Sequence, residues 1–218
     1  MGLPQLKAQA QPLYTVEEYL ALERSSEKRH IFLDGQVFEM SGESDAHGEI
    51  SVNIVGSLHA QLRGTPCRVR TKDTKVRSGP ARPKPGSRKG LFSFPDILVV
   101  CGEREYMDEH KDVLLNPTVI IEVLSDSTQD FDRKEKLRRY RFYLPSLRDY
   151  VLVEQTMPYL DHYSRQENGT WLFQSADGLE SSINLPSINC RLELSDVYDR
   201  VEFPPEPDEP DEPQFPFI

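Results

Sequence analysis

The sequence of 218 residues lacks the features that mark membrane and secreted proteins. No apolar run approaches the roughly 18 to 20 residues that a membrane-spanning helix needs. Residues 1–11 contain one lysine and no apolar run, so we do not expect a secretory signal there. The three cysteines (Cys67, Cys101 and Cys190) are odd in number and far apart, which argues against a zinc-type pair and against a disulfide framework. With 37% hydrophobic and 28% charged residues, we expect a soluble globular protein in a reducing, cytoplasmic setting.

The sequence also lacks the short motifs of several enzyme classes. It has no glycine-rich phosphate loop, no nucleophile elbow and no HExxH zinc motif, so a small-molecule enzyme has no supporting pattern.

The net charge of −10 is unfavourable for nucleic acid, but residues 202–218 carry six of the acids and no base. Residues 63–89, in contrast, carry ten Lys and Arg residues and one acid, Asp73. A polyanionic partner is therefore not excluded, although tight non-specific DNA binding is not expected.

We expect one folded domain over residues 14–202, because the chain is long enough for one full core and too short for two. Residues 1–13 are expected to be extended or disordered. Residues 203–218 alternate proline with acids, which removes backbone donors and adds repulsion, so we expect a disordered acidic tail.

The pattern of apolar residues predicts a mixed α/β (α+β) fold. Thr15 is expected to cap a short helix, and Asp34-Gly35 forms the turn of a hairpin. The continuous apolar runs 97–100 and 119–121 are typical of strands buried on both faces at the centre of a sheet. Further expected elements are helices over 45–62 and 130–143, strands over 67–71, 150–153, 159–165, 170–174 and 190–192, a loop over 78–89 and a last helix capped by Ser195. We expect them to form a single sheet.

Two acids stand at the ends of the central apolar strands. Asp96 precedes the first run and Glu122 follows the second. Acids on neighbouring strands could share one Mg²⁺ ion, which accepts one or two carboxylates and keeps several waters. Lys136 and Tyr140 are four residues apart on the next helix, so both could point at these acids. The alternative remains open that each acid caps a turn or pairs with an arginine, and that the helix is an ordinary solvated one.

These residues resemble the Uma-type restriction endonuclease family, which belongs to the PD-(D/E)XK nuclease superfamily. The resemblance covers residues 14–204 and rests on an ordered set of short segments. They are Tyr14 to Tyr19, Lys28 to His30, Asp34-Gly35, Ala46 to Gly48, Pro95-Asp96, Leu115 to Thr118, Ile121 to Ser125, Asp132 with Lys136 and Tyr140, and Leu144 to Tyr150. The resemblance implies a restriction-endonuclease-like fold, with a central mixed sheet flanked by helices.

The resemblance also implies a set of site residues. Asp96 and Glu122 match the two metal-binding acids, and Lys136 matches the catalytic lysine, because Leu124 stands where the superfamily expects that lysine. His47 and Tyr140 are possible further members of the active site, although a core or capping histidine is about equally consistent. The chain departs from the family at three positions. These are Ile31 and Gln36, where family members often carry acids, and Asp126, where proline is usual.

We therefore expect a deoxyribonuclease that depends on Mg²⁺ or Mn²⁺ and hydrolyses DNA phosphodiester bonds. The missing acids motivate an alternative, a catalytically inactive nuclease fold that binds nucleic acid or protein. A homodimer is the expected assembly, with an interface at the hairpin over residues 159–173. The candidate contacts to the DNA backbone are Arg68, Arg70, Lys72, Lys75 and Arg77.

Overall fold

A computed structural model describes residues 12–80 and 84–204. Most of the expected N-terminal extension and acidic tail, residues 1–11 and 205–218, lies outside the described residues, as does Arg82 in the basic segment. Within the described part of the chain, no helix has the length and apolar character to cross a membrane.

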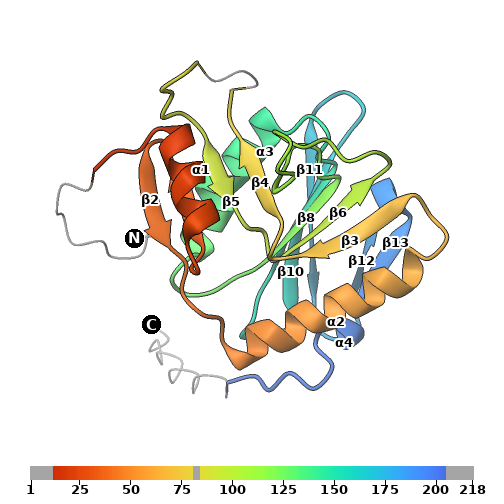
Figure 1. Cartoon of the computed structure of the whole chain (residues 1–218). Coiled ribbons are helices and arrows are strands. Elements are labelled where there is room, and N and C mark those ends of the chain that lie inside the picture. Colours follow the sequence, from red (N-terminus) through yellow and green to blue (C-terminus); the bar gives the residue numbers. More distant parts are fainter. Residues whose placement is uncertain (1–11, 81–83, 205–218) are drawn as a thin grey trace, which may run out of the picture.

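The larger sheet has six strands in the order β11-β10-β9-β8-β6-β3. β8 lies antiparallel to β6 and parallel to β9, so the sheet is mixed. The helix α2 packs its apolar residues Ile50, Ile54 and Leu58 against one face of this sheet, and Figure 1 shows it running along that face beside α4. The helix α3 covers the other face through Tyr140. The elements are β3 (Cys67–Thr71), β6 (Ile97–Cys101), β8 (Val119–Val123), β9 (Asp149–Val153), β10 (Tyr159–Arg165), β11 (Trp171–Asp177), α2 (Asp45–Gln61), α3 (Leu137–Tyr143) and α4 (Leu194–Val197).

A second sheet has five short strands in the order β2-β1-β5-β4-β7. The helix α1 packs on it through Val16, Tyr19 and Leu20, which contact Phe32 and Phe92 in a separate apolar cluster. Its elements are α1 (Val16–Ser25), β1 (His30–Leu33), β2 (Gln36–Glu39), β4 (Lys75–Ser78), β5 (Leu91–Ser93) and β7 (Val113–Leu114). A small third sheet pairs β12 (Ser182–Leu185) with β13 (Cys190–Glu193), joined by the 3₁₀ turn η2 (Pro186–Ile188).

Several local predictions are confirmed. Thr15 caps α1 in a capping box with Glu18, and Asp34 and Gly35 both take positive φ values in the turn between β1 and β2. The runs 97–100 and 119–121 form adjacent, buried strands.

The expected helix over 130–143 is also confirmed, although its first part is a wide π-helical turn, η1 (Phe131–Lys136), that continues into α3. Two other predictions are wrong. The strands form three sheets rather than one. The last helix is preceded by Glu193 as its cap, with Ser195 inside it. These errors have one physical origin, since sheet membership and helix ends depend on contacts between segments distant in the sequence.

The expectation that the cysteines form no disulfide is also wrong. Cys67 on β3 and Cys101 on β6 are cross-strand partners and form a disulfide, whereas Cys190 is free and buried. The sequence separation of 34 between the paired cysteines hid this pairing, because an antiparallel register brings together residues from opposite ends of a long connection. A reducing, cytoplasmic setting therefore stays a prediction, without support from the cysteines.

Candidate active site

The two acids singled out in the sequence lie opposite each other on neighbouring strands. Ile97 on β6 pairs with Ile121 on β8, so one further step in this antiparallel register sets Asp96 against Glu122. Directly opposed residues of an antiparallel pair share one face, with Cβ atoms about 4.5–5.5 Å apart. The backbone N–H of Val123 donates to Asp96 Oδ2 at 2.8 Å, which fixes this carboxylate at the end of the sheet.

Glu122 is almost completely buried, with 2% of its surface exposed. Its Oε1 atom lies 3.0 Å from the Lys136 ammonium and accepts a longer contact of 3.4 Å from the Tyr140 hydroxyl. That hydroxyl also bonds Ser93 Oγ at 2.8 Å. Burial raises the pKa of Glu122 to about 8, and the positive charge of Lys136 only partly offsets this. The carboxyl is therefore held in an environment that disfavours its charged form, even with the Lys136 ammonium beside it.

Lys136 lies between two carboxylates. Besides Glu122, its ammonium contacts Asp132 Oδ1 at 2.6 Å, and Asp132 is itself buried. Burial alone would lower the pKa of Lys136, but the charges of Asp132 and Glu122 outweigh burial and raise it well above its ordinary value. The lysine therefore stays a cation at neutral pH. The π-helical turn η1 carries both Asp132 and Lys136, so their pairing is built into one local element.

A second chain of polar contacts reaches Asp96 from α2. His47 Nε2 lies 3.2 Å from Asp96 Oδ2, and His47 Nδ1 lies 3.2 Å from Glu43 Oε2. Glu43 in turn pairs with Lys72. Ser44 caps α2 by accepting a hydrogen bond from the His47 backbone, which places the imidazole in the first turn of the helix. Burial would lower the pKa of His47, but its hydrogen bond to Asp96 outweighs burial and raises it.

The acids, Lys136 and His47 line a single open cleft of about 680 Å³. The opposite wall comes from the hairpin of the smaller sheet, where the cross-strand partners Ile31 and Phe38 both line the cleft. The cleft thus lies between the two sheets. Its floor is charged and its hairpin wall is partly apolar.

The donor set fits a hard divalent cation with few protein ligands. Asp96 and Glu122 each have one carboxylate oxygen for which no hydrogen-bond partner is found in residues 12–80 and 84–204. In the same residues, no group of three or more His, Cys, Asp and Glu side chains is arranged to hold a metal. Two carboxylates completed by water suit Mg²⁺ or Mn²⁺ and do not suit a zinc site, which takes three or four protein ligands.

Comparison with known proteins identifies the family. The family model Uma2, described as "Putative restriction endonuclease", matches residues 16–196, most of the chain. The chain belongs to the Uma2 family.

Two relatives of this Uma2 chain come from Synechocystis. "Uncharacterized protein slr1290" is 31% identical over 195 residues, which covers 88% of this chain and 95% of that protein. "Uncharacterized protein sll1609" is 25% identical over 171 residues, covering 78% and 92%. A crystal structure from Anabaena variabilis, titled as a putative nuclease belonging to DUF820, superposes with a TM-score of 0.66 at 18% identity, covering 84% of this chain and 97% of that one. The likeness to this structure shows that the fold is the restriction-endonuclease-like mixed sheet expected from the sequence.

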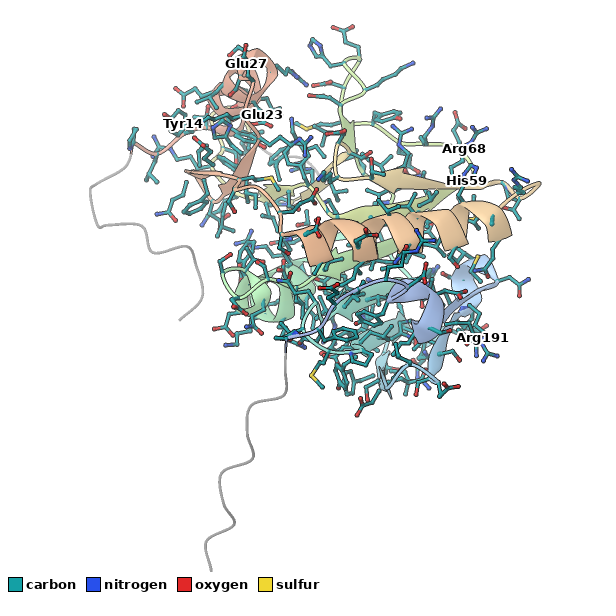
Figure 2. The ribbon with its side chains drawn as sticks, turned by 90° about the horizontal axis from the view of Figure 1, so that it is seen from below. Tyr14, Glu23, Glu27, His59, Arg68 and Arg191 are labelled. Carbon is teal, nitrogen blue, oxygen red and sulfur yellow. A yellow bond between two sulfur atoms is a disulfide. The ribbon has the colours of Figure 1, made fainter. Side chains whose placement is uncertain are left out.

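The basic residues proposed for DNA contact separate into three groups in this Uma2 fold. Lys75 and Arg77 are buried: Lys75 lies 5.4 Å from the ring centroid of Phe94, and Arg77 donates to the carbonyl of Pro80. This burial removes both from the candidate contacts. The basic sequence pattern suggested exposed side chains, but aromatic rings and backbone carbonyls can accommodate a buried cation. Figure 2 shows Arg68 at the right of the molecule and Glu27, which lines the cleft, at the upper left. Arg68 therefore lies away from the cleft.

Of the remaining two candidates, Arg70 is half-buried and bonds Thr74. Lys72 is the candidate that lines the cleft among the described residues. Two acids of the Uma2 site had no place in the predicted set, Glu43 and Asp132. The sequence already indicates that Asp132 shares a helical face with Lys136 through its i, i+4 spacing, but no site role followed from that. Glu43 has the same spacing to His47, but it lies just outside the helix, where spacing carries little weight.

Proposed function

We propose that this protein is a metal-dependent endonuclease that hydrolyses DNA phosphodiester bonds. The observation that supports this most strongly is the convergence of Asp96, Glu122 and Lys136 in one cleft, from the start of β6, from β8 and from η1. Membership of the Uma2 family points to the same chemistry.

In this proposal Asp96 and Glu122 hold Mg²⁺ or Mn²⁺, which when bound supplies Lewis-acid activation of the phosphate and a lowered pKa of water. The Lys136 ammonium stabilises the negative charge that develops on the phosphate oxygens, and its raised pKa suits this electrostatic role better than that of a general base. His47 positions Asp96 through the 3.2 Å contact to Oδ2, leaving the other oxygen free for the cation. Lys72 at the cleft rim is the candidate contact to the DNA backbone.

The test is cleavage of supercoiled plasmid and of single-stranded circular DNA with Mg²⁺ or Mn²⁺. We expect Asp96→Asn and Lys136→Met to reduce the cleavage rate by about 100-fold or more, as loss of a key electrostatic group does in other enzymes. Lys134→Met is the matched control, since Lys134 lies on the same turn with 73% of its side chain exposed, and it should keep the parent rate. Cleavage that persists in both site variants would contradict the proposal.

A second candidate function is a binding module on an inactive nuclease scaffold. The specific observation in its favour is that Ile31 lines the cleft, so an apolar side chain faces the site where an acid could have stood. This alternative predicts salt-dependent DNA binding that survives Asp96→Asn and needs no divalent ion. Isothermal titration with Mn²⁺ separates the two functions. Saturable heat that disappears in Glu122→Gln supports the nuclease, and equal or absent heat in both proteins supports the binding module.

A further inference from the structure

The strand β11 forms an open edge of the six-stranded sheet, since it pairs with β10 and with no other strand among the described residues. Two hydrogen bonds fix which of its backbone groups face outward. Gly178 N–H donates to the Pro158 carbonyl at one end of the hairpin, and Gln166 N–H donates to the Thr170 carbonyl at the other. Hydrogen-bonded pairs alternate along an antiparallel ladder. The backbone groups of Trp171, Phe173 and Ser175 therefore point away from β10 toward the open edge.

The side chains of β11 do not protect this edge. Leu172 is 48% exposed and Phe173 is 52% exposed, and as consecutive strand residues they lie on opposite faces of the sheet. Soluble proteins usually protect an edge strand with charges, proline or a bulge. From Trp171 to Ala176 this strand has none of these and no charged residue. Both faces and the backbone of the edge are thus suited to pairing with another strand.

We propose that a second copy of this chain pairs with this edge, antiparallel and about a two-fold axis at Gln174, so that two six-stranded sheets become one continuous sheet. Outward-facing residues must pair with outward-facing residues, which restricts the register to steps of two. Centring on Gln174 sets Phe173 against Ser175 of the partner subunit and Trp171 against Asp177 of the partner subunit.

Charge complementarity selects this register. The guanidinium carbons of Arg165 and Arg141 lie 4.8 Å and 5.6 Å from the centroid of the Trp171 ring. Asp177 forms no ion pair within residues 12–80 and 84–204. Because directly opposed strand residues share one face, Asp177 of the partner subunit meets this arginine pair, and the two-fold axis repeats the contact at the other end. The inference rests on the fold alone and does not depend on the proposed function.

The test is the mass of the full chain in solution, measured by sedimentation equilibrium at micromolar concentrations. We expect the parent to have twice the 25.1 kDa mass of one chain. Phe173→Lys adds a charge to the edge. Ser175→Pro removes an outward backbone donor without breaking a backbone hydrogen bond to β10, although it also removes the side-chain hydrogen bond between Ser175 and Tyr159. Each should raise the dissociation constant of the dimer at least about tenfold. Val52→Lys is the matched control, since Val52 is an exposed apolar residue on α2, and it should stay dimeric.

A charge exchange tests the register itself. Asp177→Arg should weaken the dimer, and the double variant Asp177→Arg with Arg141→Asp should restore it at least in part. Circular dichroism of each variant establishes that it is folded. A parent that is monomeric at all concentrations overturns the proposal, as does a parent dimer that neither Phe173→Lys nor Ser175→Pro weakens. A dimer weakened by those two variants, but unchanged by Asp177→Arg and not restored by the exchange, overturns the register.

Discussion

Raising the pH of the metal-free protein from about 5 to about 8.5 should lower its free energy of unfolding, because Glu122 must then ionise while buried. Burial raises the pKa of this carboxyl from 4.5 to about 8, against the opposing charge of Lys136. A group whose folded pKa exceeds its unfolded pKa binds more protons when folded. Its contribution to stability is therefore complete below pH 4.5 and is lost as the pH rises toward 8 and beyond.

Other groups with shifted pKa values also contribute to the dependence of stability on pH, and three of them need to be separated from Glu122. The pKa values of Asp34 and Asp112 are lowered by their partners Arg139 and Arg24, with burial acting in the opposite direction. Their stabilisation is lost only as the pH falls through the acidic range, below this window. His47 has a raised pKa, so it loses stabilisation with rising pH, in the same direction as Glu122. A variant of Glu122 itself is needed to separate the two.

The size of the effect follows from about 1.4 kcal/mol for each tenfold change in a proton equilibrium. A rise from 4.5 to about 8 corresponds to about 5 kcal/mol in full, of which on the order of 4 kcal/mol would be lost between about pH 5 and about pH 8.5, and this is an upper limit. Water entering the cleft and movement of Lys136 would reduce this, so we expect a loss of about 2 kcal/mol or more. Urea unfolding at each pH measures it.

Glu122→Gln keeps the shape of the side chain and cannot ionise, so its stability should fall much less over this window. Glu167→Gln, in the exposed turn between β10 and β11, is the control and should keep the dependence of the parent. Addition of Mn²⁺ should stabilise the parent more at about pH 8.5 than at about pH 5 and should have little effect on Glu122→Gln. Stability that is flat with pH in the parent, or an unchanged slope in Glu122→Gln, would refute the reasoning about burial.

Two further changes test other parts of the site and fold. Asp132→Asn removes one of the two anions beside Lys136, so it should lower the free energy of unfolding, measured by urea unfolding, by about 2 kcal/mol. It should also reduce DNA cleavage more than Lys134→Met does. An unchanged stability would show that Glu122 alone holds the lysine. Replacing Cys67 and Cys101 together by serine should cost about 3 kcal/mol, because the disulfide closes a long loop in the unfolded chain; a reducing agent should then destabilise the parent but leave the double variant unaffected.

The larger sheet was predictable where hydrophobic patterning is strong. The runs 97–100 and 119–121 need no information beyond their β-branched and leucine residues, which indicate strands buried on both faces. Of the smaller sheet, the hairpin of β1 and β2 was predictable from its Asp34-Gly35 turn. The strands β4, β5 and β7 were not, since they have two to four residues each. Lys75 and Arg77 make β4 polar in sequence, although the fold buries both. A short strand gets its identity from the neighbours it pairs with, and these are not local.

The candidate site likewise has some contacts that local sequence patterns predict and others that only tertiary packing determines. Lys136, Tyr140 and Asp132 could be placed on one helical face, because i, i+4 spacing is a local property. The pairing of Asp96 with Glu122 required only that two adjacent strands be antiparallel in a suitable register. The contact of His47 with Asp96 depends instead on where the first turn of α2 meets the end of β6, which only tertiary packing determines.

The position of the site between the two sheets explains how its chemistry can change without loss of the fold. The chain passes from β5 of the smaller sheet to β6 of the larger sheet through residues 94–96, so Asp96 stands at the crossing. The larger sheet supplies Glu122, with Lys136 from the turn that follows β8, while the smaller sheet supplies the hairpin wall with Ile31. Ile31 is only partly buried, and a polar residue there would face the cleft rather than the core. Substitutions on this wall can therefore alter what the cleft binds while the buried strands that carry the acids stay unchanged.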